Sequence, residues 1–174
     1  HWLDAAGYAD SEGFGEKDLE RKWAWKYRDY VINALNKDKP FDQFVREQLA
    51  GDEMVPQPYK NLSADAIEKL TATGFLRMGP WDNAMIKDEE AQQIYRDDLV
   101  NNIGQTFLST TMRCFKCHDH KFDPLPTRDY YRMYAALAGT QMAERPLRLT
   151  AGENRAGFTE NKTFVQRMFD FARG

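Results

Sequence analysis

The stretch Cys114-Phe115-Lys116-Cys117-His118 contains both cysteines of the chain, and His120, another of its three histidines, follows two positions later. Two thiols separated by two residues, with a histidine directly after the second, form the C-x-x-C-H pattern of c-type haem attachment. The spacing has a mechanical reason. Two such thiols can add to the two vinyl groups on one side of a porphyrin, and the next residue then directs its imidazole to the iron. Covalent attachment and axial ligation therefore come from one short turn.

Three other interpretations of the same residues compete with haem. A redox dithiol or disulfide is typical of a strand–helix unit, whereas this pair follows a long helical pattern with no strand beside it. Zinc could be bound by Cys114, Cys117 and two histidines. Such a site normally takes its second ligand pair from a separate element, and His118 and His120 crowd the first pair. The third interpretation is a chance juxtaposition in a core. The motif alone favours haem and leaves the others open.

Charge and length limit the remaining possibilities. A chain of 174 residues is long enough for one domain with a proper core, and we treat residues 1–174 as a single domain. The 24 Lys and Arg residues nearly balance 27 Asp and Glu residues, so the chain has no basic field for nucleic acid. Its apolar runs are far shorter than the roughly 20 residues of a membrane-spanning helix. We therefore expect neither nucleic-acid binding nor membrane insertion by this segment.

Apolar residues recur at three- and four-residue steps through most of the chain, which is the period of amphipathic helices. The clearest case is Tyr95, Leu99, Ile103 and Phe107. No convincing two-residue alternation predicts a strand, so the predicted fold class is all-α, at least half helical. The expected helices span residues 16–36, 40–51, 63–74, 88–111 and 127–139, with a last one around residues 164–169 after a loop at 143–160.

Several separated blocks resemble the planctomycete-type cytochrome c domain, the PSCyt family, in its second cytochrome-like module. They are "HWLDAAGYADS", "WKYRDYVINALNKDKPFDQFVREQLAGD", "ATGFLRMGPW" and "CFKCHDHKFDPLPTRDYYRMYAALAG". The resemblance runs from residue 1 to about 139 and leaves out residues 140–174 and the loop near 52–62. It implies a single-domain, c-type cytochrome-like helical fold built around one haem. Cys114 and Cys117 would be the thioether anchors and His118 the proximal iron ligand.

The resemblance also implies a location and a context. Proteins of this kind carry their haem outside the cytoplasm, so we expect a periplasmic or extracellular protein. Flanking domains are typical of the family, so we expect the chain to be a segment of a longer exported protein. A redox partner domain or protein would then exchange electrons with it.

The second iron ligand is harder to assign. His120 is excluded as the distal ligand because two residues span at most about 7 Å, too short to reach the other face of the porphyrin. His1 is far away in sequence and therefore free of this restriction, and it is our first choice. The alternatives are Met142, Met168 and an open position.

Other charged residues allow further roles. Asp10, Glu12, Asp119 and Asp123 suggest calcium as a second possible cofactor, although their spacing does not match an EF-hand loop. Asp119 and Asp123 fit better as residues that cap turns or orient a histidine. Three basic residues around the motif are candidates for haem propionate partners or for simple solvation: Arg113, Lys116 and Lys121.

The sequence thus predicts a mono-haem c-type domain that transfers electrons within a larger extracytoplasmic protein. One alternative is a haem enzyme of the peroxidase or oxygenase type with an open distal site. Another is a non-haem interaction module stabilised by zinc or by its thiols. The sequence offers no Ser-His-Asp arrangement and no Gly-rich phosphate loop for a different kind of enzyme.

Overall fold

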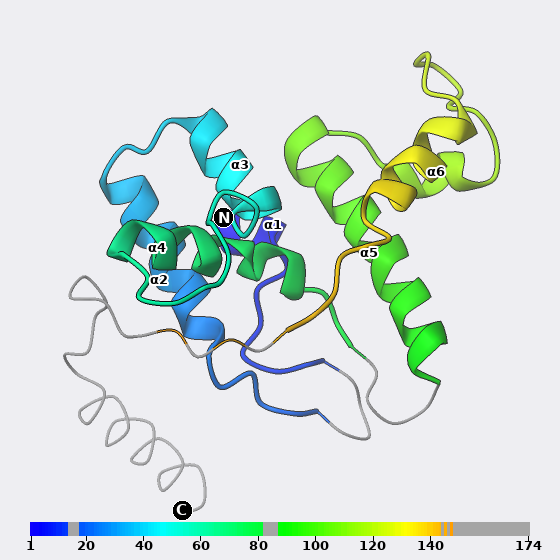
Figure 1. Cartoon of the computed structure of the whole chain (residues 1–174). Helices are drawn as coiled ribbons and strands as arrows, with labels where there is room; N and C mark the ends of the chain where they lie inside the picture. Colours follow the sequence, from blue (N-terminus) through cyan, green and yellow to red (C-terminus); the bar gives the residue numbers. More distant parts are fainter. Residues whose placement is uncertain (14–17, 82–86, 144, 146, 148–174) are drawn as a thin grey trace, which may run out of the picture.

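A computed structural model describes residues 1–13, 18–81, 87–143, 145 and 147 of the chain (Figure 1). Helices account for 57% of these residues, which confirms a mostly helical fold. Extended pairing within the same residues is limited to one antiparallel bridge between Ser11 and Glu20. The α-helices are α1 (Trp2–Ala5), α2 (Ala24–Asn36), α3 (Phe41–Ala50), α4 (Ala64–Ala72), α5 (Asp88–Leu108) and α6 (Thr127–Ala136), and the 3₁₀ helices are η1 (Thr73–Arg77) and η2 (Met112–Lys116).

The helices of the first half follow the predicted pattern with shifted ends. The prediction that a helix begins at residue 16 is wrong, because α2 begins at Ala24. The preceding residues use their backbone differently: Arg21 N–H donates to Asp10 O at 2.7 Å and Glu12 N–H to Leu19 O at 2.9 Å. Because residues 19–21 pair with residues 10–12, residues 18–23 do not belong to the helix.

Helices α3 and α4 lie where the sequence predicts them. Pro40 directly precedes α3. Ser63 caps α4, since its hydroxyl accepts a hydrogen bond from Ala66 N–H at 3.1 Å. The helical segment does not end at Gly74 as predicted, because the 3₁₀ helix η1 extends it to Arg77. The first short helix, α1, has too few residues for periodicity to predict it.

Helix α5 is shorter than predicted, and this changes the position of the cysteines. It ends at Leu108 rather than near Thr111, because Ser109 adopts the left-handed conformation with φ +52°. The C-x-x-C-H sequence therefore does not lie at the end of the long helix. It occupies the separate turn η2 and the residues directly after it.

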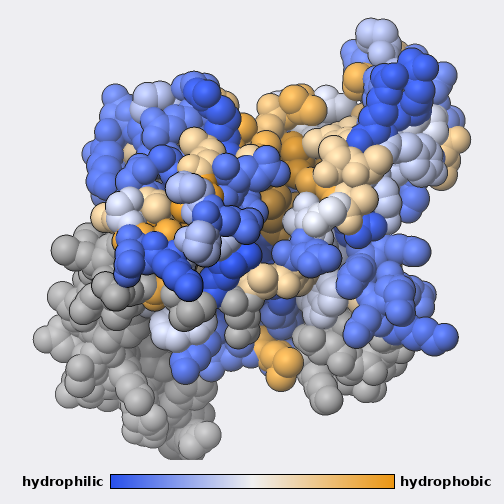
Figure 2. Space-filling view, viewed as in Figure 1, coloured by the Kyte–Doolittle hydropathy of each residue, from blue (hydrophilic) through white to orange (hydrophobic). Residues whose placement is uncertain are grey.

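The larger core cluster joins α5 to the first half of the chain. Most of its buried members come from the predicted apolar faces of α2, α3 and α5, and the others are Ala6, Ala72 at the end of α4, Phe75 of η1 and Met78 after it (Figure 1). In the space-filling view, apolar residues gather over the middle of the molecule, along the seam between α3 and α5 (Figure 2). The buried residues are Ala6, Tyr27, Tyr30, Val31, Ala34, Phe44, Ala72, Phe75, Met78, Tyr95, Leu99 and Ile103.

A smaller cluster lies on another face of α5. Val100 of α5, Met112 and Phe115 of η2, and Tyr130 of α6 are its buried members. Helix α5 thus contributes residues to both clusters. The larger cluster contains most of the core, and the smaller one includes residues of the cysteine-bearing turn. Neither cluster contains a cysteine.

Two predictions concern residues that the structure does not describe. The helix predicted around residues 164–169 lies outside them, as does most of the loop expected at 143–160. In the part of the chain that the structure describes, no helix is both long and apolar enough to cross a membrane.

Candidate functional site

Turn η2 brings the two cysteines to the surface. Both are free thiols and both are exposed, whereas Phe115 between them is 1% exposed. Cys117 caps the turn with φ −108° and ψ −25°. The backbone between the two cysteines is kinked at Phe115, whose φ −90° and ψ +17° are not helical. The turn thus exposes two thiols that lie three positions apart in the sequence and flank the buried Phe115.

The side chains between the two cysteines hold the turn against α5 and α6. Phe115 packs in the smaller cluster with Val100 and Tyr130. Lys116 reaches back to α5, where its Nζ lies 3.1 Å from Oδ2 of Asp97. Its backbone carbonyl accepts a hydrogen bond from Tyr131 Oη of α6 at 3.2 Å. Phe115 is thus held by burial, and Lys116, whose side chain is 43% exposed, is held by contacts at its amino group and its backbone carbonyl.

The residues at the start of η2 are fixed in the same way. Arg113 N–H donates to Oδ1 of Asn101 at 3.2 Å, and its guanidinium pairs with Asp98. Met112 lies against Gly104. Arg113 and Lys116 each form an ion pair with a carboxylate of α5. A role toward haem propionates stays a prediction.

Asp97 has a perturbed carboxyl group. Burial by itself raises the pKa of this group, but hydrogen bonds from Tyr130 and Lys116 outweigh burial and hold the pKa below its ordinary value. The same contact and burial raise the pKa of the Tyr130 phenol. Asp97 therefore stays ionised at neutral pH while it contacts both neighbours.

His118 lies directly after the turn and has an exposed side chain. Its Nδ1 lies 2.8 Å from the carbonyl oxygen of Asp119. When Nδ1–H donates to such a carbonyl, the lone pair on Nε2 is left free for a metal. Two exposed thiols three positions apart, with a histidine directly after the second, are the residue types that would hold haem c.

The two acidic residues after the motif have the structural roles that the sequence favours. Asp119 Oδ1 accepts a hydrogen bond from Thr127 N–H at 2.8 Å, where α6 begins. Asp123 N–H donates to Nδ1 of His120 at 3.0 Å, and its carboxylate lies 3.1 Å from the same nitrogen. The His120 ring also packs edge-to-face on Phe115, with centroids 5.7 Å apart. His120 is thereby held beneath the turn.

Two of the candidate distal ligands, His1 and Met142, belong to the described residues. His1 is exposed at the start of α1. The backbone of α1 and the residue after it contact α5: Ala5 O and Ala6 O accept hydrogen bonds from Thr106 and Asn102. Met142 is 39% exposed and follows α6. Met168 lies outside the described residues.

The carboxylates considered for calcium do not gather at one place. Asp10 accepts a hydrogen bond from Tyr8 Oη at 2.6 Å, and Glu12 forms ion pairs with Arg21 and Arg77. Asp119 and Asp123 have the partners described above. Throughout the described ranges, no three His, Cys, Asp or Glu side chains form a group that could hold a metal ion. Calcium stays a prediction without a structural site.

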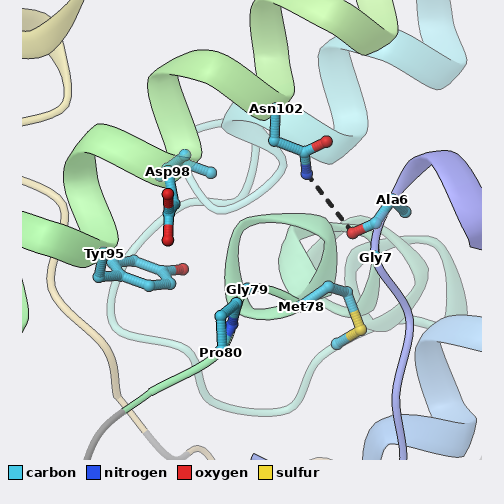
Figure 3. A pocket seen from close by; sticks show the side chains of 9 residues that line it. Ala6, Gly7, Met78, Gly79, Pro80, Tyr95, Asp98 and Asn102 are labelled. Atoms are coloured by element: carbon cyan, nitrogen blue, oxygen red, sulfur yellow. Dashed lines mark hydrogen bonds between the residues drawn. The ribbon is translucent and has the colours of Figure 1, made fainter. Parts of the chain in front are cut away.

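A small open pocket lies between α5 and the residues after α1 and η1 (Figure 3). Tyr95, Asp98 and Asn102 supply its polar groups, and its volume is about 150 Å³. Small-molecule sites usually measure roughly 300–1,000 Å³, so the pocket would admit only a very small ligand. It contains neither cysteine and no histidine.

Sequence reasoning missed the face of α5 that supports the turn. Asp97, Asn101 and Gly104 follow one another at steps of four and three residues, the spacing of one helix face. These residues form a polar stripe opposite the apolar stripe of the helix, and the stripe contains a glycine. This pattern could have predicted that the face makes a close contact, but it does not identify the segment that packs there.

Comparisons with known proteins identify the chain's relatives. The family model PSCyt2, described as a protein of unknown function (DUF1549), matches residues 1–142. No curated protein and no solved structure matches the chain. The matched residues include all helices described above and the complete C-x-x-C-H motif. The chain therefore belongs to the PSCyt2 (DUF1549) family.

Proposed function

We propose that this chain is a mono-haem c-type cytochrome domain that transfers electrons within a larger extracytoplasmic protein. Cys114 and Cys117 would hold the haem through thioether bonds, and His118 would ligate the iron on the proximal side. The observation that carries the proposal is the pair of free, exposed thiols on turn η2, followed by a histidine whose Nε2 is available.

The protein's own residues would hold and orient the cofactor. When bound, haem supplies an iron that gains and loses one electron at a time. Turn η2 would present both thiols at the surface, and the contact with Asp119 O would orient the His118 ring. Because the turn lies on the surface, we place the haem at an edge of the helical fold, where a redox partner domain could approach it.

The test is expression in a host that matures c-type haem outside the cytoplasm. The purified protein should be red and should weigh one haem more than the polypeptide. Acid–acetone should not extract the pigment, because thioether bonds survive unfolding. Pigment that is fully extracted, or a colourless protein with both thiols free, would contradict the proposal.

Single substitutions then test each residue. Cys114→Ser and Cys117→Ser should each leave at most one thioether bond and shift the absorption bands of the denatured haem. His118→Ala should retain the attached haem but change the iron's spin state. His120→Ala is the matched control, because this histidine is only two residues away and is outside the motif. We expect it to leave attachment intact.

A haem enzyme of the peroxidase or oxygenase type is the second candidate. It is favoured by one observation: α1, which carries His1, contacts a face of α5 other than the one that supports η2. If no protein ligand reaches the second iron position, that position is open to a small molecule. Rapid binding of cyanide to the oxidised protein, with a high-spin spectrum beforehand, would support the enzyme. A colourless preparation containing zinc would instead support the metal- or thiol-stabilised module.

A further inference from the structure

We infer that Asp97 is a positioning residue that presets the Cys114–Cys117 pair in the folded, haem-free protein. Nothing in the motif itself predicts this role, because Asp97 lies 17 positions before the first cysteine. The inference deepens the proposed function, but its main test uses the thiols alone and does not depend on haem.

One carboxylate joins the three elements around the motif. Asp97 belongs to α5, and its Oδ1 accepts a hydrogen bond from the Tyr130 hydroxyl of α6. Its Oδ2 lies 3.1 Å from Nζ of Lys116 in η2. Hydrogen bonds to charged groups contribute more than neutral ones, so this junction restrains the turn more firmly than an ordinary contact does.

The restraint acts on a residue between the two cysteines. Lys116 is held at both ends, by Asp97 through Nζ and by Tyr131 through the backbone carbonyl. Phe115 is held by burial. The segment between the cysteines is thus anchored, while the flanking thiols are exposed. Asp97 thus acts on the thiols through Lys116 and does not contact them.

The neighbouring residue provides a matched control. Asp98 is also on α5, also carries a carboxylate and also pairs with a basic residue of η2. Its partner Arg113 lies before the first cysteine rather than between the two, and the Arg113 guanidinium is exposed. Asp98→Asn therefore removes a similar charge without releasing the segment that connects the thiols.

Equilibration with glutathione measures how well the thiols are positioned. Cys114 and Cys117 together transfer two electrons and two protons to glutathione disulfide, which gives one protein disulfide and two glutathione molecules. The equilibrium constant reports the effective concentration of one thiol toward the other. We expect it to be at least about tenfold higher in the folded wild type than in the chain unfolded in urea, because the contacts of Phe115 and Lys116 restrain the backbone between the two cysteines.

Asp97→Asn should lower this constant about tenfold toward the unfolded value, as expected for loss of a hydrogen bond to a charged group. Lys116→Gln should have a similar effect, and the double variant should lose little more than either single variant. Asp98→Asn should change the constant less than about twofold. Equal effects of Asp97→Asn and Asp98→Asn, or no effect of Asp97→Asn, would overturn the inference.

Circular dichroism separates local release from unfolding. If the Asp97→Asn protein loses helix signal, the Tyr130→Phe variant is used for the test in its place. This change removes the hydroxyl that bonds to Asp97 and keeps the buried ring. It should lower the constant about threefold, and an unchanged constant would count against the inference. In a haem-maturing host, Asp97→Asn should also reduce the fraction of chains that carry haem. If wild type takes up no haem, the proposed function fails, while the glutathione result still decides the role of Asp97.

Discussion

Met112 packs against the backbone of Gly104, at the position where any larger residue of α5 would place its Cβ. A Cβ atom on Gly104 would overlap Cγ of Met112 and lie 2.9 Å from the carbonyl oxygen of Thr110. Glycine in the interior of a helix costs about 1 kcal/mol relative to alanine. Here it allows η2 to fold back directly onto the helix that precedes it.

Gly104→Ala should therefore destabilise the protein despite the better helix propensity of alanine. Overpacking of this kind costs about 1–3 kcal/mol, so we expect a net loss of about 1–2 kcal/mol in the free energy of unfolding. Urea denaturation measures it. Gly139→Ala is the control, because its Cβ would meet nothing within 4 Å, and its effect should stay within about 0.5 kcal/mol. A stabilised Gly104→Ala protein would show that η2 does not pack as described.

A buried carboxylate on α3 makes stability depend on pH. Glu47 is 1% exposed, and its carboxylate contacts Lys39, Gln43 and Tyr30. Burial alone raises the pKa of this carboxyl, but the hydrogen bonds outweigh burial and lower the pKa below its ordinary value of 4.5. Glu47 thus contributes stability that is fully present above pH 4.5 and is lost as the pH falls through its folded-state pKa.

Glu47→Gln should accordingly cost most at neutral pH. We expect a loss of about 2–4 kcal/mol at pH 7, because the substitution breaks a buried ion pair, and a smaller difference from wild type at pH 3. Urea denaturation across this range is the measurement. Asp65→Asn, on the exposed face of α4, should change stability by less than about 1 kcal/mol at each pH. A wild-type–variant difference that does not shrink in acid would refute the role of Glu47.

Both motif thiols should react in the native haem-free protein. Cys114 and Cys117 are exposed, so a disulfide reagent such as Ellman's should titrate two thiols per chain without denaturant. The reaction of the reduced protein should be complete before any loss of helix signal. If the thiols react only after unfolding, the turn is buried and the surface site described above is wrong.

The apolar stripe of α5 shows which features of the fold can be predicted from the sequence. Tyr95, Leu99 and Ile103 are buried as their spacing predicts, because helix periodicity depends only on local geometry. The ends of helices depend on other contacts. Ser109 adopts φ +52°, and no glycine or asparagine at that position signals this conformation.

The sequence proposes the chemistry of the candidate site but does not predict which residues support it. C-x-x-C-H is a contiguous motif, so its three candidate side chains can be named without a structure. Asp97 becomes relevant only when η2 folds back on α5, which places residues 19 positions apart in contact. The burial of Glu47 likewise depends on Lys39 and on Tyr30 of α2, so no local pattern distinguishes it from an exposed glutamate.

The last prediction concerns the distal ligand of the proposed haem, and it rests on which faces of α5 are in contact with α1 and η2. Thr106 and Asn102 contact the backbone of Ala5 and Ala6, whereas Asn101 contacts η2. With 100° per residue, Thr106 and Asn101 point in directions about 140° apart on a helix about 10 Å across. Figure 1 shows α1 and the cysteine-bearing turn on different sides of α5. α1 and η2 thus contact different faces of α5.

We therefore expect His1→Ala to leave the spectrum of the oxidised, haem-loaded protein unchanged, contrary to our first choice from the sequence. Met142→Leu and Met168→Leu test the remaining candidates in the same preparation. A change to high-spin iron in His1→Ala would show that His1 does ligate the iron. Dilution would then distinguish two routes: a bond made within one chain persists at low protein concentration, whereas a bond contributed by a second chain is lost.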